Sequence, residues 1–485
     1  MTQFDKRNLS MMMDFYEMTM SYGYFHQCHG DVRVAFDLFF RSVPDKGGYA
    51  VFAGLEHVIE FVENLSFSEA DIDYFRAQNL FSEEFLSFLR HFRFRGDIYA
   101  VPEGTIIYPD EPLMTIVAPI IDAQLIETAI LAQINHQSLI ATKASRIVRA
   151  AEGRKVSDFG ARRAHNMDAA TYGARAAYIG GVDMTATVSA GQQFGIPISG
   201  TMAHSWVMFF EDEFTAFKKY AELYPQATVL LVDTYDVIHS GIPNAIRTAH
   251  EVLAPQGHRL AGVRIDSGDL AYLSKRVRTM LDDAGLTDCK IILSNSLDEF
   301  TISSLLLQGA QVDSFGVGER LITAKSDPVF GAVYKLVAVE KDGVFAPRIK
   351  MSENVEKLTN PGIKDLYRIY DRHGKAVADM LAMRGEEIDL TKPFRYVDPR
   401  KPWKNRFFEG VTAVNLRRPY MRAGKRVEQL PTLEEVRRYV QKQLTEEIWP
   451  EEQRFENPHR HYLDMTPMYY EIKMGLLDDM RGKHS

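Results

Sequence analysis

The 485-residue chain contains only two cysteines, Cys28 and Cys289, which lie far apart in the sequence. This scarcity excludes a disulfide framework and any zinc site built from cysteines, and it favours a reducing compartment. The sequence has no apolar run near the roughly 20 residues that cross a bilayer, and its first residues lack the basic and then apolar pattern of a signal peptide. We therefore expect a cytoplasmic protein that has no membrane-spanning segment.

Positive charge is not in excess either. The chain has 57 Lys and Arg residues against 65 Asp and Glu residues, a formal net charge of −8. This balance argues against a nucleic-acid-binding protein, which needs a net basic face, and leaves local basic clusters for small anions. Signatures of a P-loop, a nucleophile elbow, a His-Glu-x-x-His metal site and a glycine-rich dinucleotide site are missing. Any use of ATP must therefore proceed without a P-loop.

What the sequence does contain is a repeated alternation of short apolar runs and helix-like segments between about Val156 and Val333. The runs are rich in β-branched residues, and the segments between them carry apolar residues at helical spacing. The predicted strands are Val156–Phe159, Ile196–Ser199, Thr228–Val232, Ala261–Ile265, Lys290–Leu293 and Val312–Val317. Such repeated units predict a parallel sheet covered by helices and closed, or nearly closed, into an irregular TIM-like α/β barrel.

The parts of the chain before and after this region have a different pattern. Residues 14–25, 55–92, 433–443 and 467–480 are helix-like, whereas residues 92–121 and 333–351 are short extended pieces separated by turns. We expect an N-terminal α/β domain over residues 1–125, the barrel over 126–340, and a C-terminal segment over 341–485. The two flanking parts are expected to combine into one β-rich α/β lateral domain.

Polar, charged or glycine residues follow nearly every predicted strand. They are Arg162 and Arg163, Thr201 and His204, Asp233 and Thr234, Asp266 and Asp269, Ser294 and Asn295, and Gly316 and Gly318. In an α/β barrel the C-terminal ends of the strands gather on one face, where the chemistry takes place. The sequence therefore predicts a single site built from these clusters.

His204 lies just past the second predicted strand, within Gly200-Thr201-Met202-Ala203-His204-Ser205. A histidine there has three possible roles: a phosphate acceptor, a general base or a packed core residue. Gly200 allows close backbone approach, Thr201 and Ser205 offer hydroxyls, and the N-terminus of the helix-like segment that follows would favour an anion. The stretch therefore favours phosphate chemistry.

Arg264 and Asp266 alternate across the fourth predicted strand and are expected to lie on the same side of it. Arg264 suits a carboxylate or phosphate, and Asp266 suits ribose hydroxyls or magnesium. The structural alternative is an internal ion pair, with Asp269 as the N-cap of the next helix. A buried pair at a strand end adds little stability, so the functional interpretation is favoured.

Four other positions are weighed in the same way. Arg162 suits an anion, whereas its neighbour Arg163 suits a solvated surface. The Gly316–Gly318 turn exposes backbone amides to a terminal phosphate or is merely tight, and the following Glu319 must point away or bind through a metal. For Asp183 the simpler structural alternative is the N-cap of a helix. For Tyr16 the simpler structural alternative is a residue of the hydrophobic core.

Five ordered motifs resemble those of the nicotinate phosphoribosyltransferases. They are Asp14-Phe15-Tyr16-Glu17-Met18-Thr19, Phe159-Gly160-Ala161-Arg162-Arg163-Ala164, the stretch around His204, Arg264-Ile265-Asp266-Ser267-Gly268-Asp269, and Phe315-Gly316-Val317-Gly318. The resemblance implies a transfer of the phosphoribosyl group of phosphoribosyl diphosphate to nicotinate, coupled to ATP hydrolysis, in NAD biosynthesis. Diphosphate leaves, and the product is nicotinate mononucleotide.

The resemblance also implies roles for single residues. His204 is the residue phosphorylated by ATP, and Asp266 acts beside it. Tyr16, Thr201 and Arg264 contact nicotinate, with Tyr16 reaching in from the other subunit of a homodimer. The phosphoribosyl group is held by Arg162, Asp183, Asp266, Gly316 and Gly318. Mg²⁺ is expected on the diphosphate, and no protein residue is assigned as a metal ligand.

Two departures from the family pattern and three alternatives complete the sequence interpretation. Glu319 replaces a common threonine after the second glycine of the phosphate turn, and His165-Asn166-Met167 replaces a turn that usually contains glutamine. A nicotinamide phosphoribosyltransferase would share the barrel and the histidine. A non-catalytic metabolite-binding relative would share the fold, but it would not need His204. A barrel aldolase is disfavoured, because no barrel strand ends in an obvious Schiff-base lysine.

Overall fold

The computed structural model describes residues 8–28, 30–350, 358–389, 394–397 and 405–484. The chain divides into two compact units. The terminal unit combines Met1–Leu139 with Val329–Ser485, and the central unit is Ile140–Pro328. One boundary falls inside the long helix α6 (Glu127–Ala150). No described helix is long and apolar enough to cross a membrane.

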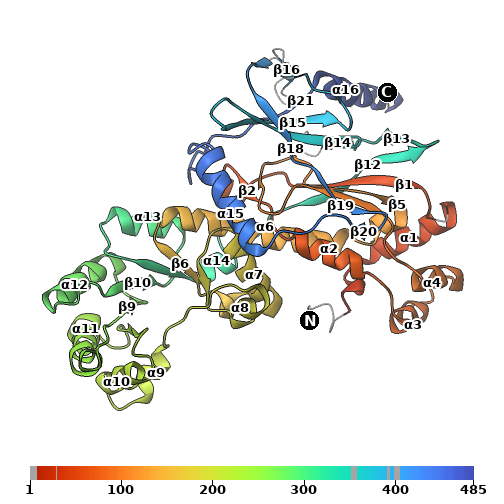
Figure 1. Ribbon diagram of the computed structural model, residues 1–485. Helices are drawn as coiled ribbons and strands as arrows, with labels where there is room; N and C mark the ends of the chain where they lie inside the picture. The colour runs from red at the N-terminus through yellow and green to blue at the C-terminus, as the bar shows by residue number, and fades with distance from the viewer. Residues whose placement is uncertain (1–7, 29, 351–357, 390–393, 398–404, 485) are drawn as a thin grey trace. The chain divides into compact units, whose positions relative to one another are not determined.

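The central unit contains a six-stranded parallel sheet (Figure 1). In spatial order its strands are β7 (Met184–Thr185), β6 (Lys155–Asp158), β11 (Ser314–Val317), β10 (Lys290–Ser294), β9 (Gly262–Ile265) and β8 (Val229–Leu231). Every neighbouring pair is parallel. The predicted α/β class with a parallel sheet is confirmed.

Helices follow the strands, as the alternating pattern predicts. They are α7 (Met167–Ile179), α8 (Val188–Phe194), α9 (His204–Phe209), α10 (Glu213–Leu223), α11 (Ile242–Thr248), α12 (Leu270–Asp283), α13 (Glu299–Leu307) and α14 (Glu319–Ile322), with short turns η4 (Ala161–Arg163), η5 (Val237–Gly241), η6 (Ala249–Leu253) and η7 (Ala254–Gln256). The predicted N-cap Asp269 is confirmed, because its carboxylate accepts a hydrogen bond from the Tyr272 amide at 3.0 Å. Gly285 and Gly309, with φ near +78° and +77°, end α12 and α13 as predicted.

The sequence and the structure differ around residues 183–199. The predicted strand at residues 196–199 is only an isolated bridge between Ile198 and Thr185. Pro197 has no amide to donate, which interrupts the ladder there. Strand β7 is not predicted, and the N-cap interpretation of Asp183 is wrong. Its amide and its carboxylate instead hydrogen-bond to the backbone of Val156 on β6, at 2.8 and 2.9 Å.

The terminal unit contains strands from both ends of the chain (Figure 1). One sheet has the order β13 (Val344–Pro347), β12 (Val333–Lys341), β1 (Arg33–Phe39), β5 (Met114–Pro119), β3 (Asp97–Ala100), β19 (Arg418–Arg422) and β20 (Lys425–Arg426). The second has the order β17 (Asn405–Phe408), β16 (Phe394–Val397), β21 (Leu463–Met465), β15 (Ala376–Met383), β14 (Lys364–Tyr370) and β18 (Thr412–Asn415), and β2 (Ala50–Val51) pairs with β4 (Ile106–Ile107). The helices are α1 (Phe15–Cys28), α2 (Leu55–Asn64), α3 (Glu69–Ala77), α4 (Glu83–Arg90), α5 (Ile120–Gln124), α15 (Leu433–Lys442) and α16 (Pro467–His484), with short turns η2 (Leu9–Met11), η3 (Pro44–Lys46) and η9 (Gln443–Glu447).

A buried ionic cluster joins distant segments of the terminal unit. Arg368 donates two hydrogen bonds to Asp379, at 2.9 and 2.6 Å, and both side chains are fully buried. The His461 ring lies between two carboxylates, with Nε2 3.4 Å from Asp379 and Nδ1 3.2 Å from Glu452. Tyr108 stacks on this ring and donates its hydroxyl to Glu452 at 2.6 Å. We refer to these five residues as the ionic cluster.

His461 is expected to stabilise the fold more at mildly acidic pH than at alkaline pH. Burial alone would lower the pKa of this imidazole, but Asp379 and Glu452 raise it above its ordinary value. Because the pKa is higher in the folded state, the stabilisation is complete below about pH 6.5 and is lost as the pH rises through the folded-state pKa. The free energy of unfolding of the wild type minus that of His461→Gln should therefore shrink with rising pH in urea titrations. A difference that grows with pH would contradict this.

Candidate active site

His204 lies at the first position of α9, near the ends of strands β8 and β9. Its Nδ1 is 3.1 Å from the hydroxyl of Thr234, and its Nε2 is 3.9 Å from a carboxylate oxygen of both Asp233 and Asp266. The side chain is 41% exposed, so the packed-core alternative is wrong. The imidazole is thus held at Nδ1 and open at Nε2, with two carboxylates beside the open nitrogen.

Asp233 is one of the strand-end residues that the sequence predicts for the site, although the sequence assigns no individual role to it. Its side chain is 1% exposed, and its Oδ2 accepts hydrogen bonds from the Asp266 amide and the Ser267 hydroxyl, at 3.1 and 2.5 Å. Its Oδ1 lies toward His204 and has no hydrogen-bond partner among the described residues. A buried carboxylate oxygen in this state is costly, so a protonated imidazole or a cation would stabilise it. Its place just beyond an apolar strand is the sequence signal that predicts it at the site.

Arg264 and Asp266 lie on the same side of β9, as their alternation predicts. Nη2 of Arg264 is 3.6 Å from Oδ1 of Asp266, and Nη1 donates a hydrogen bond to the Thr201 hydroxyl at 2.8 Å. Asp266 also accepts a short hydrogen bond from the hydroxyl of Ser294 at the end of β10. The structure therefore brings Thr201, His204, Arg264 and Asp266 together.

The guanidinium of Arg264 is buried and only partly compensated by the carboxylates of Asp266 and Asp233. Its side chain is 12% exposed, and its Nε is buried without a hydrogen-bond partner among the described residues. Burial lowers the pKa of Arg264, and the positive charge of Arg162 adds to that effect, whereas Asp266 and Asp233 oppose it. Because an anion near both guanidinium groups would offset these effects, the arrangement suits a carboxylate or a phosphate.

Gly316 and Gly318 allow the turn after β11 to pack against Phe159, which follows β6. A Cβ atom on Gly316 would lie 2.4 Å from the Phe159 ring, and one on Gly318 would lie 3.2 Å from the Phe159 carbonyl oxygen. Gly318 precedes α14 with φ −116° and ψ −102°. Packing therefore explains the glycine at position 316, and phosphate binding by both glycines stays a prediction.

Glu319 is engaged by neighbouring cations. Its carboxylate accepts a hydrogen bond from Lys325 at 2.6 Å and lies 4.0 Å from Nε of Arg163. The hydrogen bond from Lys325 and its charge lower the pKa of Glu319. These two positive side chains offset the acid that would otherwise repel an anion at this turn.

Arg162 and Asp183 lie outside the group around His204. Arg162 is exposed on η4, although its charge still acts on Arg264. Asp183 lies beside the start of β6, away from the strand ends near His204. Tyr16 belongs to the terminal unit and occupies the first turn of α1. It is 43% exposed, so its interpretation as a core residue is wrong. Partial burial of its hydroxyl, together with the charge of Glu127, raises the pKa of Tyr16.

Comparisons with known proteins identify the family. The N-terminal domain model of nicotinate phosphoribosyltransferase (NAPRTase) matches residues 11–135, the NAPRTase family model matches 154–360, and the C-terminal domain model matches 363–473. The chain is 43% identical over 483 residues to nicotinate phosphoribosyltransferase of Bacillus subtilis, a match that covers 99% of this chain and 97% of the relative. It is 34% identical over 528 residues to nicotinate phosphoribosyltransferase of Caenorhabditis elegans, covering 95% and 92%.

A solved structure supports the same assignment. The crystal structure of human nicotinic acid phosphoribosyltransferase matches with a TM-score of 0.85 at 27% identity, and the match covers 96% of this chain and 100% of that one. The chain therefore belongs to the nicotinate phosphoribosyltransferase family.

Proposed function

We propose that the chain transfers the phosphoribosyl group of phosphoribosyl diphosphate to nicotinate and couples this transfer to ATP hydrolysis through a phosphohistidine at His204. The products are nicotinate mononucleotide, diphosphate, ADP and phosphate, so the reaction is of the ATP-dependent ligase type and serves NAD biosynthesis. Family membership supports the transfer. The observation that carries the coupling is the partly exposed side chain of His204, whose Nε2 lies beside Asp233 and Asp266.

In the proposed coupling step, the lone pair of Nε2 attacks the γ-phosphorus of ATP. The bond from that phosphorus to the bridging oxygen breaks, and ADP leaves. A proton on Nδ1, directed at the Thr234 hydroxyl, would leave the lone pair on Nε2. Water later cleaves the phosphorus–nitrogen bond, which releases phosphate and restores the imidazole.

Nicotinate is assigned to Arg264 and Thr201. The ligand carries a carboxylate, and the buried, only partly compensated guanidinium of Arg264 is suited to bind one in bidentate fashion. The Thr201 hydroxyl, already bonded to Arg264, orients that guanidinium. We also propose that Tyr16 reaches this ligand from the partner subunit of a homodimer, which its exposure on α1 permits.

The phosphoribosyl group is assigned to Arg162, Asp266 and the Gly316–Gly318 turn. Displacement of diphosphate leaves a cation-like sugar, so a carboxylate near the ribose and cations near the diphosphate lower the barrier. Asp266 and Arg162 are the groups of these types near Arg264. Asp183 stays a prediction from the family resemblance alone.

Mg²⁺ fits the carboxylates of this site. Asp233 offers a buried oxygen without a hydrogen bond, and Asp266 is 27% exposed. Mg²⁺ is commonly held by one or two carboxylates together with substrate phosphates. Among the described residues no group of three or more His, Cys, Asp or Glu is arranged to hold a metal ion, so we propose that Mg²⁺ is held mainly by the diphosphate. When bound, it would offset the charge of the leaving group.

We further propose that the sheet of the central unit forms part of an irregular barrel. The bridge from Ile198 to Thr185 extends the parallel order beyond β7. Residues 196–199 would then stand beside β7 at the edge of the sheet opposite β8. This arrangement supports closure, with His204 following the added segment.

Arg264→Lys is expected to weaken nicotinate binding. Lysine keeps the charge but loses the planar fork, so the apparent KM for nicotinate should rise by roughly 10- to 100-fold, with a smaller change in the KM for phosphoribosyl diphosphate. Steady-state kinetics would measure both constants. Arg259→Lys, at an exposed ion pair of the same unit, is the control and should leave both unchanged. An unaltered KM for nicotinate in Arg264→Lys would remove Arg264 from this role.

Turnover of nicotinate against nicotinamide in the presence of ATP tests the substrate assignment. Because Arg264 has no carboxylate partner in the amide, we expect nicotinate to be preferred. A preference for nicotinamide would contradict the proposed function.

A further inference from the structure

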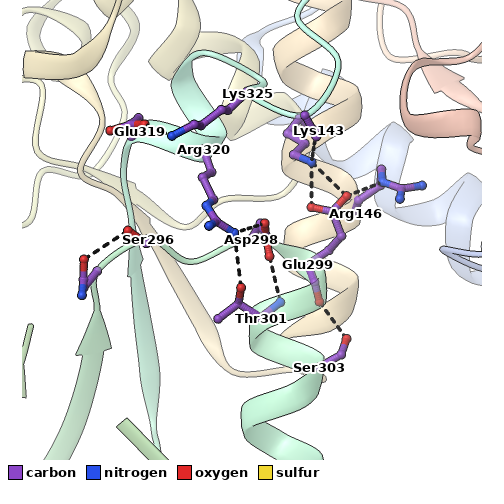
Figure 2. A network of polar contacts seen from close by, with 12 residues as sticks. Lys143, Arg146, Ser296, Asp298, Glu299, Thr301, Ser303, Glu319, Arg320 and Lys325 are labelled. Atoms are coloured by element: carbon purple, nitrogen blue, oxygen red, sulfur yellow. Dashed lines mark hydrogen bonds and ion pairs between the residues drawn. The ribbon is translucent and has the colours of Figure 1, made fainter. Parts of the chain in front are cut away.

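We propose that Arg320 and Asp298 form a positioning pair, which holds the Gly316–Gly318 turn in the position that binds phosphoribosyl diphosphate. This inference rests on the proposed assignment of that turn to the phosphoribosyl group. Figure 2 shows the Arg320 side chain directed from α14 to Asp298 and Thr301 at the start of α13. Arg320 donates a short hydrogen bond to Asp298 and a longer one, of 3.4 Å, to the Thr301 hydroxyl.

The pair connects the loops that follow two neighbouring strands. Strands β10 and β11 are paired in parallel, with Ser294 opposite Gly316. After β10 the chain passes through Asn295 and Ser296, whose φ angles of +93° and +49° are uncommon for residues other than glycine. After β11 it enters α14 directly from Gly318. The turns that follow β10 and β11 lie beyond the paired residues of these strands, so backbone hydrogen bonds of the sheet do not hold them together. The distance between the two turns therefore depends on contacts such as that between Arg320 and Asp298.

The start of α13 is held in place by buried hydrogen bonds to α6. Glu299, the residue after Asp298, is fully buried and accepts hydrogen bonds from Lys143 and Arg146 of α6, at 3.0 and 2.8 Å. Lys143 also donates to the hydroxyl of Ser326 at 2.8 Å. In Figure 2 the side chains of Lys143 and Arg146 are directed to Glu299, in the first turn of α13. Arg320 therefore ties the short helix α14, and the glycine turn before it, to an anchored element.

Asp298 has two roles that one substitution can separate. Its Oδ1 caps α13 by accepting a hydrogen bond from the Thr301 amide at 2.8 Å, whereas its Oδ2 accepts the bond from Arg320. Asparagine caps helices as well as aspartate does, but it cannot form the charge-assisted bond. Asp298→Asn therefore removes the connection to α14 while keeping the helix start.

The chain supplies a matched control for this substitution. The tetrapeptide Asp-Glu-Phe-Thr occurs at residues 212–215 as well as at 298–301. Asp212 caps α10 through the Thr215 amide at 2.8 Å, and the following Glu213 is buried, as Glu299 is. No described arginine hydrogen-bonds to Asp212, whose carboxylate is bonded to Thr215. Asp212→Asn thus changes a similar cap without breaking an arginine pair.

Steady-state kinetics of Asp298→Asn, Arg320→Gln and Asp212→Asn test the proposal. Because small displacements of a positioning group strongly reduce productive binding, we expect the KM for phosphoribosyl diphosphate to rise on the order of tenfold in Asp298→Asn and in Arg320→Gln. The KM for nicotinate and the thermal unfolding midpoint should stay close to the wild-type values. Arg320→Lys, which keeps the charge, should recover part of the loss, and Asp212→Asn should behave as the wild type does.

Gly318→Ala distinguishes failure of this inference from failure of the proposed site. If Gly318→Ala raises the KM for phosphoribosyl diphosphate but Asp298→Asn and Arg320→Gln do not, the turn binds the substrate without the pair, and the inference is overturned. If none of these variants changes that KM, the assignment of the turn itself is wrong. An equal rise of both KM values in Asp298→Asn, or a large fall in its unfolding midpoint, would show a purely structural role and would also overturn the inference.

Discussion

His204→Ala is expected to abolish the acid-labile labelling of the protein by the γ-phosphate of radiolabelled ATP. The imidazole Nε2 is the proposed phosphate acceptor, and alanine offers no nitrogen in its place. ATP hydrolysis should no longer accompany transfer, so the increase in kcat/KM that the proposed coupling to ATP predicts for the wild type should be absent from the variant. Labelling after acid and alkaline treatment, together with the ratio of ADP to nicotinate mononucleotide formed, measures both effects.

His239→Ala is the matched control for this experiment. Its imidazole belongs to the same unit, is 84% exposed, and has its Nδ1 3.1 Å from the nearby carboxylate of Asp236. Loss of this histidine should leave labelling and coupling unchanged. Labelling that persists in His204→Ala would show that another residue accepts the phosphate.

The chemistry-bearing positions of the site were predictable because they follow apolar runs directly. Arg264 and Asp266 are two residues apart on one strand, so their shared side follows from local geometry, and the contact of 3.6 Å agrees with it. Asp233 also follows an apolar run, but its contact with His204 could not be predicted in this way. Its carboxylate meets His204 only because distant segments fold together, and no local pattern specifies that contact.

The fold shows the same division between local and distant information. Periodicity predicts most strands of the central unit, but it does not specify that β6 pairs with β11 across more than half of that unit. Strand β7 has two residues, which is too few for an alternating pattern to be visible. Asp183 illustrates the resulting error, because an aspartate beside a short strand has the same local sequence signal as a helix N-cap.

The ionic cluster of the terminal unit was not predictable from composition. Charged residues in a sequence are mostly exposed, yet Arg368 and Asp379 are fully buried on adjacent strands β14 and β15. Their partners Tyr108 and His461 come from segments hundreds of residues apart. Burial of these charges becomes possible only when all the partners are in place, so the cluster ties the N-terminal and C-terminal segments to one folded state.

Asp379→Asn should therefore be strongly destabilising. The variant is nearly isosteric, but it leaves the guanidinium of Arg368 and the ring of His461 buried without the carboxylate that they share. Removal of one member of a buried ionic group typically costs about 3–5 kcal/mol, and we expect a loss of this size in the free energy of unfolding. Urea titration followed by circular dichroism would measure it. Glu83→Gln, which breaks the exposed pair with Arg76, is the control and should cost no more than about 1 kcal/mol.

The pH dependence of this loss provides a second check. Burial alone would raise the pKa of Asp379, but the charge of Arg368 lowers it far below its ordinary value. A carboxyl group whose pKa is lower in the folded state stabilises the protein above its unfolded-state pKa, near 3.9, and the effect is lost as the pH falls through the folded-state pKa. The difference between the wild type and Asp379→Asn should therefore persist at about pH 5, well above both values. A difference below about 1 kcal/mol at neutral pH would show that the buried pair contributes no more than an exposed one, and that the connection between the two ends of the chain depends on apolar packing instead.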